Sequence, residues 1–189
     1  MSNTEHCPDD DAIVEATRRW LEKAVIGLNL CPFAKAVYVK EQVRYVVSHA
    51  TTPEVLLEEL MNQLQDLADT DPEKVDTTLL IHPQVLGDFL DFNDFLDVAD
   101  AALEDMQLEG ELQVASFHPD YQFADTDPSD ITNYTNRAPY PILHLLREDS
   151  IARAVEAFPD AADIFEKNIE TMEKLGHEGW DKLDVGPAR

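Results

Sequence analysis

Three stretches of the chain are rich in β-branched and aromatic residues, and each of them closes on a histidine. They span residues 43–49, 77–82 and 112–118 and end at His49, His82 and His118. A helix-like pattern of apolar residues separates the first stretch from the second, and another separates the second from the third. Strands joined by helical crossovers run parallel, and their last residues lie at one edge of the sheet. Open α/β folds bind ligands at that edge, so the sequence predicts that distant histidines share one site.

Helical periodicity extends this pattern over the rest of the chain. Helices are expected at 11–29, at 53–69 with Thr51 or Thr52 as the cap, between Pro83 and Gly110, at 141–156 and at 160–175. Residues 37–40 are compatible with a short edge strand. The expected fold class is α/β, with a small, mainly parallel sheet of three to four strands flanked by about five helices. Residues 1–189 are expected to form a single domain, with 1–10 and 178–189 as loose tails.

The segment 118–140 shows no periodicity. Loops of this length are uncommon in compact domains unless they are functional or disordered. The segment contains several aromatic residues, which is untypical of a disordered linker. We therefore expect it to be ordered and to pack against the rest of the protein.

The chain is strongly acidic, with a net charge of −25 from 39 Asp and Glu against 14 Lys and Arg. Nucleic acids and anionic membranes are bound through positive patches, so neither is an expected partner. No apolar run approaches the roughly 20 residues of a membrane-spanning helix, and the N-terminus lacks a signal-peptide core. The expected location is cytoplasmic, and a protein partner stays open.

His82 and His118 are each followed by proline, which ends a central strand, so both imidazoles are expected where the chain leaves the sheet. A neutral imidazole there can bind a metal or move a proton near pH 7. Three histidines with an open fourth position would suit a catalytic zinc ion. Alternatively, each imidazole hydrogen-bonds a loop carbonyl, or the rings point to opposite faces of the sheet. The sequence leaves open whether a metal or a cofactor is bound.

A second group of polar residues follows a long stretch without cations. No lysine or arginine occurs between Lys74 and Arg137. Arg147 follows His144 by three residues and would share its helix face, and two guanidiniums can clamp a carboxylate or phosphate. Alternatively, each arginine pairs with one of the many carboxylates. The candidate ligand-binding residues are Arg137, Arg147, Asn136, Asn133 and Tyr121, and the candidate catalytic residues are His118, His82, His49 and His144.

Three motifs carry a resemblance to a known family. They are segment 20–34, which contains Val-Ile-Gly-Leu-Asn-Leu-Cys-Pro-Phe-Ala, segment 117–123, which reads Phe-His-Pro-Asp-Tyr-Gln-Phe, and segment 136–148, which begins Asn-Arg-Ala-Pro-Tyr-Pro. Together they resemble the uncharacterised, mainly bacterial family catalogued as domain of unknown function 1415. The resemblance spans most of the chain and implies a soluble, single-domain bacterial protein. It implies no activity, cofactor or catalytic residue.

These observations favour an enzyme that acts on an anionic small molecule at a histidine and arginine site on the C-terminal edge of the sheet. His118 would be the acid–base or ligand residue, helped by His82 or His49. The anion would be held by Arg137, Arg147 and Asn136. The alternative is a noncatalytic module that binds a ligand or a protein partner through the segment 118–140.

Overall fold

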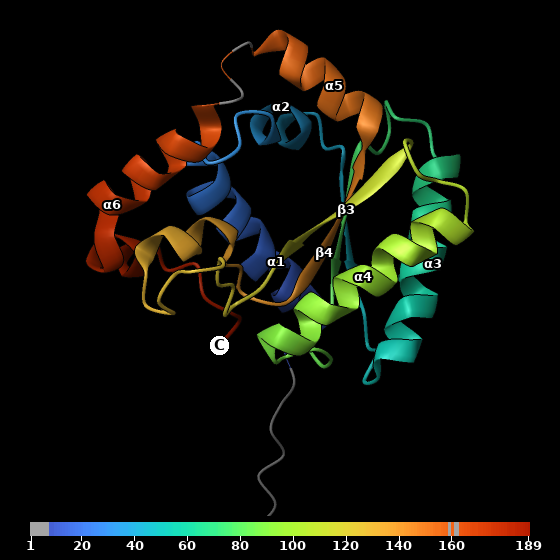
Figure 1. Cartoon of the computed structure of the whole chain (residues 1–189), viewed down its shortest axis with the longest axis horizontal. Coiled ribbons are helices and arrows are strands. Elements are labelled where there is room, and N and C mark those ends of the chain that lie inside the picture. The colour runs from blue at the N-terminus through green and yellow to red at the C-terminus, as the bar shows by residue number, and fades with distance from the viewer. Residues whose placement is uncertain (1–7, 159, 161–162) are drawn as a thin grey trace, which may run out of the picture.

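The computed structural model describes residues 8–158, 160 and 163–189. Its centre is a four-stranded sheet in the order β1-β2-β4-β3. The strands are β1 (Val43–Val47), β2 (Thr77–Ile81), β3 (Leu112–Phe117) and β4 (Ile142–Arg147). One face is covered by α3 (Pro53–Asp69) and α4 (Phe89–Asp105), and the other by α1 (Asp10–Trp20), as Figure 1 shows. The expected α/β class and the three histidine-ending strands are confirmed.

The sheet is mixed, so the expectation of a mainly parallel sheet is wrong. β1 and β2 pair in parallel, whereas β4 pairs antiparallel with both β2 and β3. The three strands that precede the histidines therefore point in one direction, and β4 runs the opposite way between two of them. The two crossovers through α3 and α4 bring the chain back to the same edge each time, as parallel strands require.

The strand β4 also overturns the helix expected at 141–156. Its residues alternate in exposure: Leu143 and Leu145 are fully buried, whereas His144 and Leu146 are only half-buried. This period of two is typical of a strand, and the helix α5 (Glu148–Ala157) begins only after it. The leucine-rich sequence suits either structure, and the hydrogen bonds to β2 and β3 decide in favour of the strand.

The N-terminal region is more helical than expected. Asp9 caps α1 through a 2.8 Å bond from the amide of Ala12, and the helix continues as a π-helix, η1 (Leu21–Ile26). Residues 37–40, which the sequence allowed as a short edge strand, lie at the end of the short helix α2 (Ala34–Val39) instead. Residues 1–7 of the expected N-terminal tail lie outside the described part of the chain.

The C-terminal segment is packed rather than loose. Helix α6 (Ile164–Leu183) is interrupted at Gly176, where φ is 64° and the backbone is not helical, and a second helical stretch follows the kink. Beyond the helix, Val185 is buried, and the amide of Ala188 donates to the hydroxyl of Tyr140 over 2.8 Å. None of the described helices is long and apolar enough to cross a membrane.

Thr52 caps α3, and its removal tests the local assignment. Its hydroxyl accepts from the amide of Val55 over 3.4 Å, and Pro53 occupies the first helical turn. We expect Thr52→Ala to lower the free energy of unfolding by about 1 kcal/mol, measured by urea denaturation. Thr51→Ala is the matched control, because the neighbouring residue is exposed and precedes the cap. Equal losses in both variants would contradict the assignment.

Candidate functional site

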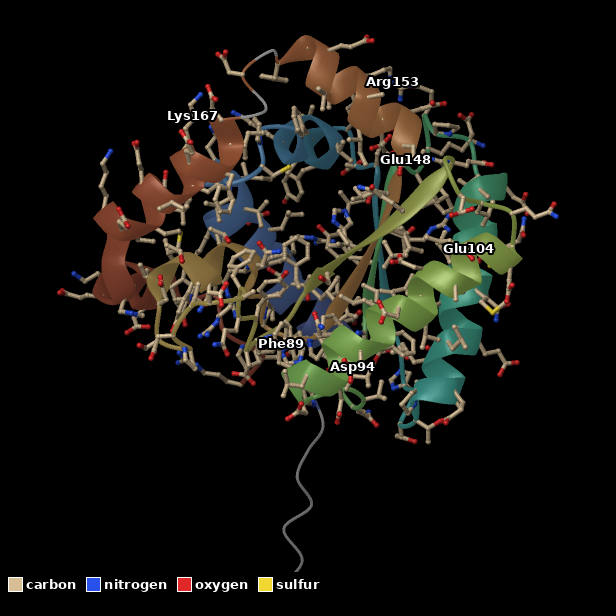
Figure 2. All side chains as sticks on the ribbon, viewed as in Figure 1. Phe89, Asp94, Glu104, Glu148, Arg153 and Lys167 are labelled. Carbon is tan, nitrogen blue, oxygen red and sulfur yellow. The ribbon has the colours of Figure 1, made fainter. Side chains whose placement is uncertain are left out.

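The structure brings two of the strand-end histidines together. His82 follows β2, His118 follows β3, and both side chains are fully buried. Both rings pack against Phe92 of α4, with centroid distances of 5.6 Å for His82 and 5.0 Å for His118. Phe89, at the first turn of α4 (Figure 2), covers His118 at 5.4 Å. The surroundings of this pair are therefore largely aromatic.

The hydrogen bonds of these two rings hold the loop that follows β2. His118 donates from Nε2 to the carbonyl of Leu86 over 3.0 Å, while its Nδ1 accepts from the amide of Asp120 over 3.0 Å. His82 donates from Nδ1 to the carbonyl of Val85 over 3.0 Å. Its Nε2 is buried and has no hydrogen-bond partner. Each imidazole thus bonds a loop carbonyl, which is one of the alternatives that the sequence left open.

Burial keeps both rings neutral. The pKa of His82 is lowered to about 4, mainly by desolvation and in part by the neighbouring His118. Desolvation also lowers the pKa of His118. The hydrogen bond to the carbonyl of Leu86 raises this pKa, but by less than desolvation lowers it. A neutral imidazole is a usable proton acceptor only if a ligand can reach its lone pair. Because His118 uses both nitrogens and His82 is sealed from solvent, neither ring offers that access.

His49 is engaged elsewhere. Its exposed ring lies 3.0 Å from the carboxylate of Asp10, at the start of α1. Within residues 8–158, 160 and 163–189, no three His, Cys, Asp or Glu side chains are grouped as metal ligands. The geometry therefore does not bring the three strand-end histidines into one metal centre.

Arg137 and Asn133 fasten the segment 118–140. Arg137 donates from Nε to the carbonyl of Tyr121 over 3.2 Å and from Nη2 to that of Pro128 over 2.7 Å. Its guanidinium also lies 4.2 Å from the ring centroid of Tyr134. Asn133 is fully buried, and its side chain bonds backbone groups of the same segment. Both polar side chains have structural partners within the loop.

The same segment packs against two helices, as its aromatic content led us to expect. Within it, η2 (Ile131–Asn136) places Tyr134 against Trp180 of α6, with centroids 5.3 Å apart. Tyr121 packs on Phe89 at 5.1 Å. The backbone carbonyl of Asn136 accepts from the amide of His118 over 3.2 Å. The segment is thus an ordered cover over the end of β3.

Arg147 binds main-chain carbonyls on the α3 face of the sheet. Its side chain is 8% exposed, and Nη2 donates to the carbonyls of Leu67, Thr70 and Val75 over 2.8 to 2.9 Å. Two of these carbonyls belong to the C-terminal end of α3, where a cation is favoured. On a strand, positions 144 and 147 face opposite sides, so Arg147 and His144 do not share a site.

His144 uses one ring nitrogen in a hydrogen bond with the described residues, as His82 does, but its partner is a hydroxyl rather than a carbonyl. Its Nε2 lies 2.8 Å from Oγ1 of Thr77, and that hydroxyl donates its single proton to the carbonyl of Leu145 over 2.6 Å. The hydroxyl must therefore accept from His144, which fixes the ring as the Nε2–H tautomer. Nδ1 then carries a lone pair, and none of the described residues donates to it. The residue is partly exposed, and its Nδ1 is not a fully buried atom without a partner, as Nε2 of His82 is.

The face on which His144 lies is incompletely covered. His144 and Leu146 occupy a central strand, yet both keep partial exposure, whereas their neighbours on the α3 face are fully buried. Helices α2 and α5 lie around this end of the sheet (Figure 1), but neither contributes a buried residue. Phe33, the N-cap of α2, and Phe158, the C-cap of α5, pack edge-on at 5.4 Å. Antiparallel strands can keep one face in contact with solvent, and the partial exposure of His144 and Leu146 shows that this face is not fully covered.

The strand register adds a second polar group to the row of His144. Tyr45, Leu79, His144 and Ala115 lie directly opposite one another across the four strands. The hydroxyl of Tyr45 is buried without a well-oriented hydrogen-bond partner, and burial raises the pKa of Tyr45 against the influence of the nearby Arg18. Two strand spacings separate the backbones of Tyr45 and His144, or roughly 10 Å.

A family model described as protein of unknown function (DUF1415) matches residues 12–182. The chain belongs to this family. The match contains all four strands and the three motifs found in the sequence, so the predicted resemblance is confirmed. A search of curated proteins and a search of solved structures gave no match.

Sequence reasoning missed Thr77 and misplaced His144. Thr77 opens β2 and reads as an ordinary β-branched strand residue. Its role becomes visible only once β4 is placed beside β2, which puts positions 77 and 144 on the same face. The signal available in the sequence was the histidine between leucines at 143 and 145, which is the alternation of a strand with one face left open.

Proposed function

We propose that the chain is an enzyme that binds a small molecule on the incompletely covered sheet face and uses Nδ1 of His144 as the proton acceptor. The observation that carries this proposal is the fixed tautomer of a half-buried, neutral imidazole whose free lone pair faces no protein donor. The ring of His118, by contrast, uses both of its nitrogens in hydrogen bonds to the loops around it.

The electrostatics keep the imidazole of His144 neutral before a ligand binds. Desolvation lowers the pKa of His144 to about 4, so the ring is neutral at pH 7 and its Nδ1 can receive a proton. An acidic O–H or N–H of the ligand would give its proton to Nδ1, which leaves an anionic ligand beside an imidazolium. The attraction between these opposite charges at short range offsets part of the cost that burial imposes on the imidazolium, while Thr77 keeps the ring oriented through Nε2–H.

Thr77 positions the ring, which gives a direct prediction. In Thr77→Val the acceptor for Nε2–H is lost, so we expect the imidazole nitrogen NMR signals of His144 to change from a single Nε2–H tautomer to a mixture. The free energy of unfolding should fall by about 1–2 kcal/mol, because the bond to the carbonyl of Leu145 is lost as well. Thr77→Ser keeps the hydroxyl and should retain the single tautomer. A wild-type ring already protonated at Nδ1 would contradict the assignment.

The activity itself is tested by screening small carboxylates and phosphate monoesters that carry an ionisable O–H or N–H. We expect at least one to raise the melting temperature, to shift the imidazole signals of His144, and to lose this effect in His144→Gln. His177→Gln, which alters an exposed histidine on α6, is the control. If ligands bind without affecting His144, the noncatalytic module that the sequence also allowed becomes the better description.

A further inference from the structure

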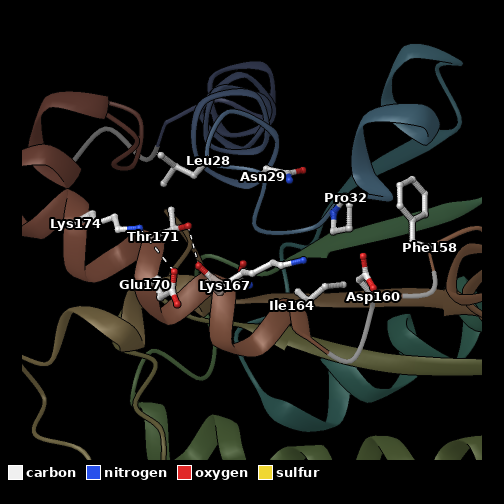
Figure 3. Close-up of a pocket in the computed structure, with 11 residues that line it drawn as sticks. Leu28, Asn29, Pro32, Phe158, Asp160, Ile164, Lys167, Glu170, Thr171 and Lys174 are labelled. Atoms are coloured by element: carbon white, nitrogen blue, oxygen red, sulfur yellow. Dashed lines mark hydrogen bonds and ion pairs between the residues drawn. The ribbon is translucent and has the colours of Figure 1, made fainter.

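A pocket of about 450 Å³ lies away from the His144 face, between residues 28–32 and α6, and Figure 3 shows it. Its volume falls in the range of small-molecule sites. The apolar part of its lining comes from Leu28, Pro32, Phe158 and Ile164. The wall is held in place, since the side-chain amide of Asn168 donates to the carbonyl of Leu30 over 3.0 Å.

Lys167 brings a free cation to this pocket. In a helix, Lys167 has Asp163 one turn before it and Glu170 one turn after it, and pairs at these spacings are favourable. No carboxylate of the described chain lies within 4.0 Å of its ammonium, however, and Glu170 pairs with Lys174 at 3.7 Å instead. Figure 3 shows the Lys167 side chain extended away from Glu170, toward the part of the pocket below Pro32. Lys167 therefore differs from Lys174 and Lys182 of the same helix, whose ammonium groups pair with carboxylates.

Asp160 brings an opposite charge to the same part of the pocket. Its carboxylate lies on the side of Phe158 and Ile164 (Figure 3) and has no ion-pair partner among the described residues. The pocket therefore presents a separated cation and anion that do not neutralise each other, beside an apolar wall. A ligand that satisfies all three features carries a carboxylate, an ammonium group and an apolar side chain.

We propose that this pocket binds a free α-amino acid with an apolar side chain. The ligand carboxylate meets Lys167, its ammonium meets Asp160, and its side chain lies against Phe158 and Leu28. The first turn of α6 adds the positive end of a helix dipole near the carboxylate. This site is independent of His144 and stands whether or not the proposed proton transfer takes place.

The test uses three probes that differ in one charge each: phenylalanine, 3-phenylpropionate and phenethylamine. Binding is followed on the full chain by NMR titration, with the side-chain amides of Asn29 and Asn168 as reporters. We expect phenylalanine to bind at least about threefold more tightly than either analogue, as expected for one exposed charge contact. Aspartate, which lacks the apolar side chain, should bind more weakly than phenylalanine.

Two variants assign the charges. Lys167→Gln should weaken the binding of phenylalanine at least threefold and leave the binding of phenethylamine unchanged. Asp160→Asn should weaken the binding of phenylalanine at least threefold and leave the binding of 3-phenylpropionate unchanged. Lys182→Gln is the matched control, because that ammonium is engaged by Glu178 at 2.7 Å and does not line the pocket, and it should bind phenylalanine like the wild type. Equal binding of all three probes, no binding of phenylalanine, or an equal loss in Lys182→Gln would overturn the proposal. All three residues are exposed or lie on helix surfaces, so the variants should fold.

Discussion

Arg147→Ala is expected to lower the free energy of unfolding by about 3–5 kcal/mol. The guanidinium satisfies three carbonyls at the end of α3 and in the turn before β2, and it is 8% exposed. A buried acceptor left without a donor costs about 1–3 kcal/mol, and alanine would remove the guanidinium from the carbonyls of Thr70 and Val75, whereas that of Leu67 still accepts from the amide of Thr70. No carboxylate of the described residues lies within 4.0 Å of the guanidinium, so its partners are carbonyl dipoles rather than an ion pair.

Urea denaturation of matched variants measures this effect. Arg147→Lys should recover only part of the stability, because one ammonium cannot reproduce the planar fork that reaches all three carbonyls. Arg153→Ala, on the exposed side of α5 (Figure 2), should change stability by no more than about 0.5 kcal/mol. A loss below about 1 kcal/mol in Arg147→Ala would show that Arg147 is free to bind a ligand, as the sequence had suggested.

The second large effect is a loss of stability in mild acid. Burial lowers the pKa of His82 and of His144 from 6.5 to about 4 in the folded chain. The unfolded chain therefore binds more protons than the folded chain between pH 6.5 and pH 4, and stability falls as the pH is lowered through that window. Each of the two histidines should reduce the free energy of unfolding by about 2 kcal/mol between pH 7 and pH 5. The pKa of His118 is also lowered by burial and adds to the effect in the same direction.

The slope of stability against pH separates this effect from the cost of the substitutions themselves. His82→Gln and His144→Gln should each flatten the slope between pH 7 and pH 5 by the contribution of one histidine, whatever their stability at pH 7. His177→Gln changes an exposed residue and should leave the slope unaltered. A wild-type stability that stays constant over this range would mean that the buried rings accept protons in the folded state.

The sequence predicted the parts of the fold that rest on local pattern. The stretches before His49, His82 and His118 are strands, because alternating β-branched residues and flanking prolines carry that information locally. The helix at 53–69 followed from spacing, and the structure identifies Thr52 as its cap where the sequence had left Thr51 and Thr52 open. In each case the information lies within about 20 consecutive residues.

The parts that could not be predicted depend on distant pairing. Residues 142–147 have a composition that suits helix or strand, and their state is fixed by the neighbours β2 and β3. This misplacement put His144 and Arg147 on one face, although the structure puts them on opposite sides of the sheet. The role of Thr77 likewise depends on a partner 67 positions away, which no local pattern reveals.

The position of β4 has a consequence for how the chain is made. The last strand to be synthesised occupies the middle of the sheet, between β2 and β3. Until residues 142–147 have left the ribosome, β4 is missing. One row of backbone N–H and C=O groups of β2, and one of β3, then has no strand to pair with. Such open edges can pair with other chains. A nascent chain that stalls before residue 142 is therefore in its most aggregation-prone state, and holding by a chaperone matters most at that point.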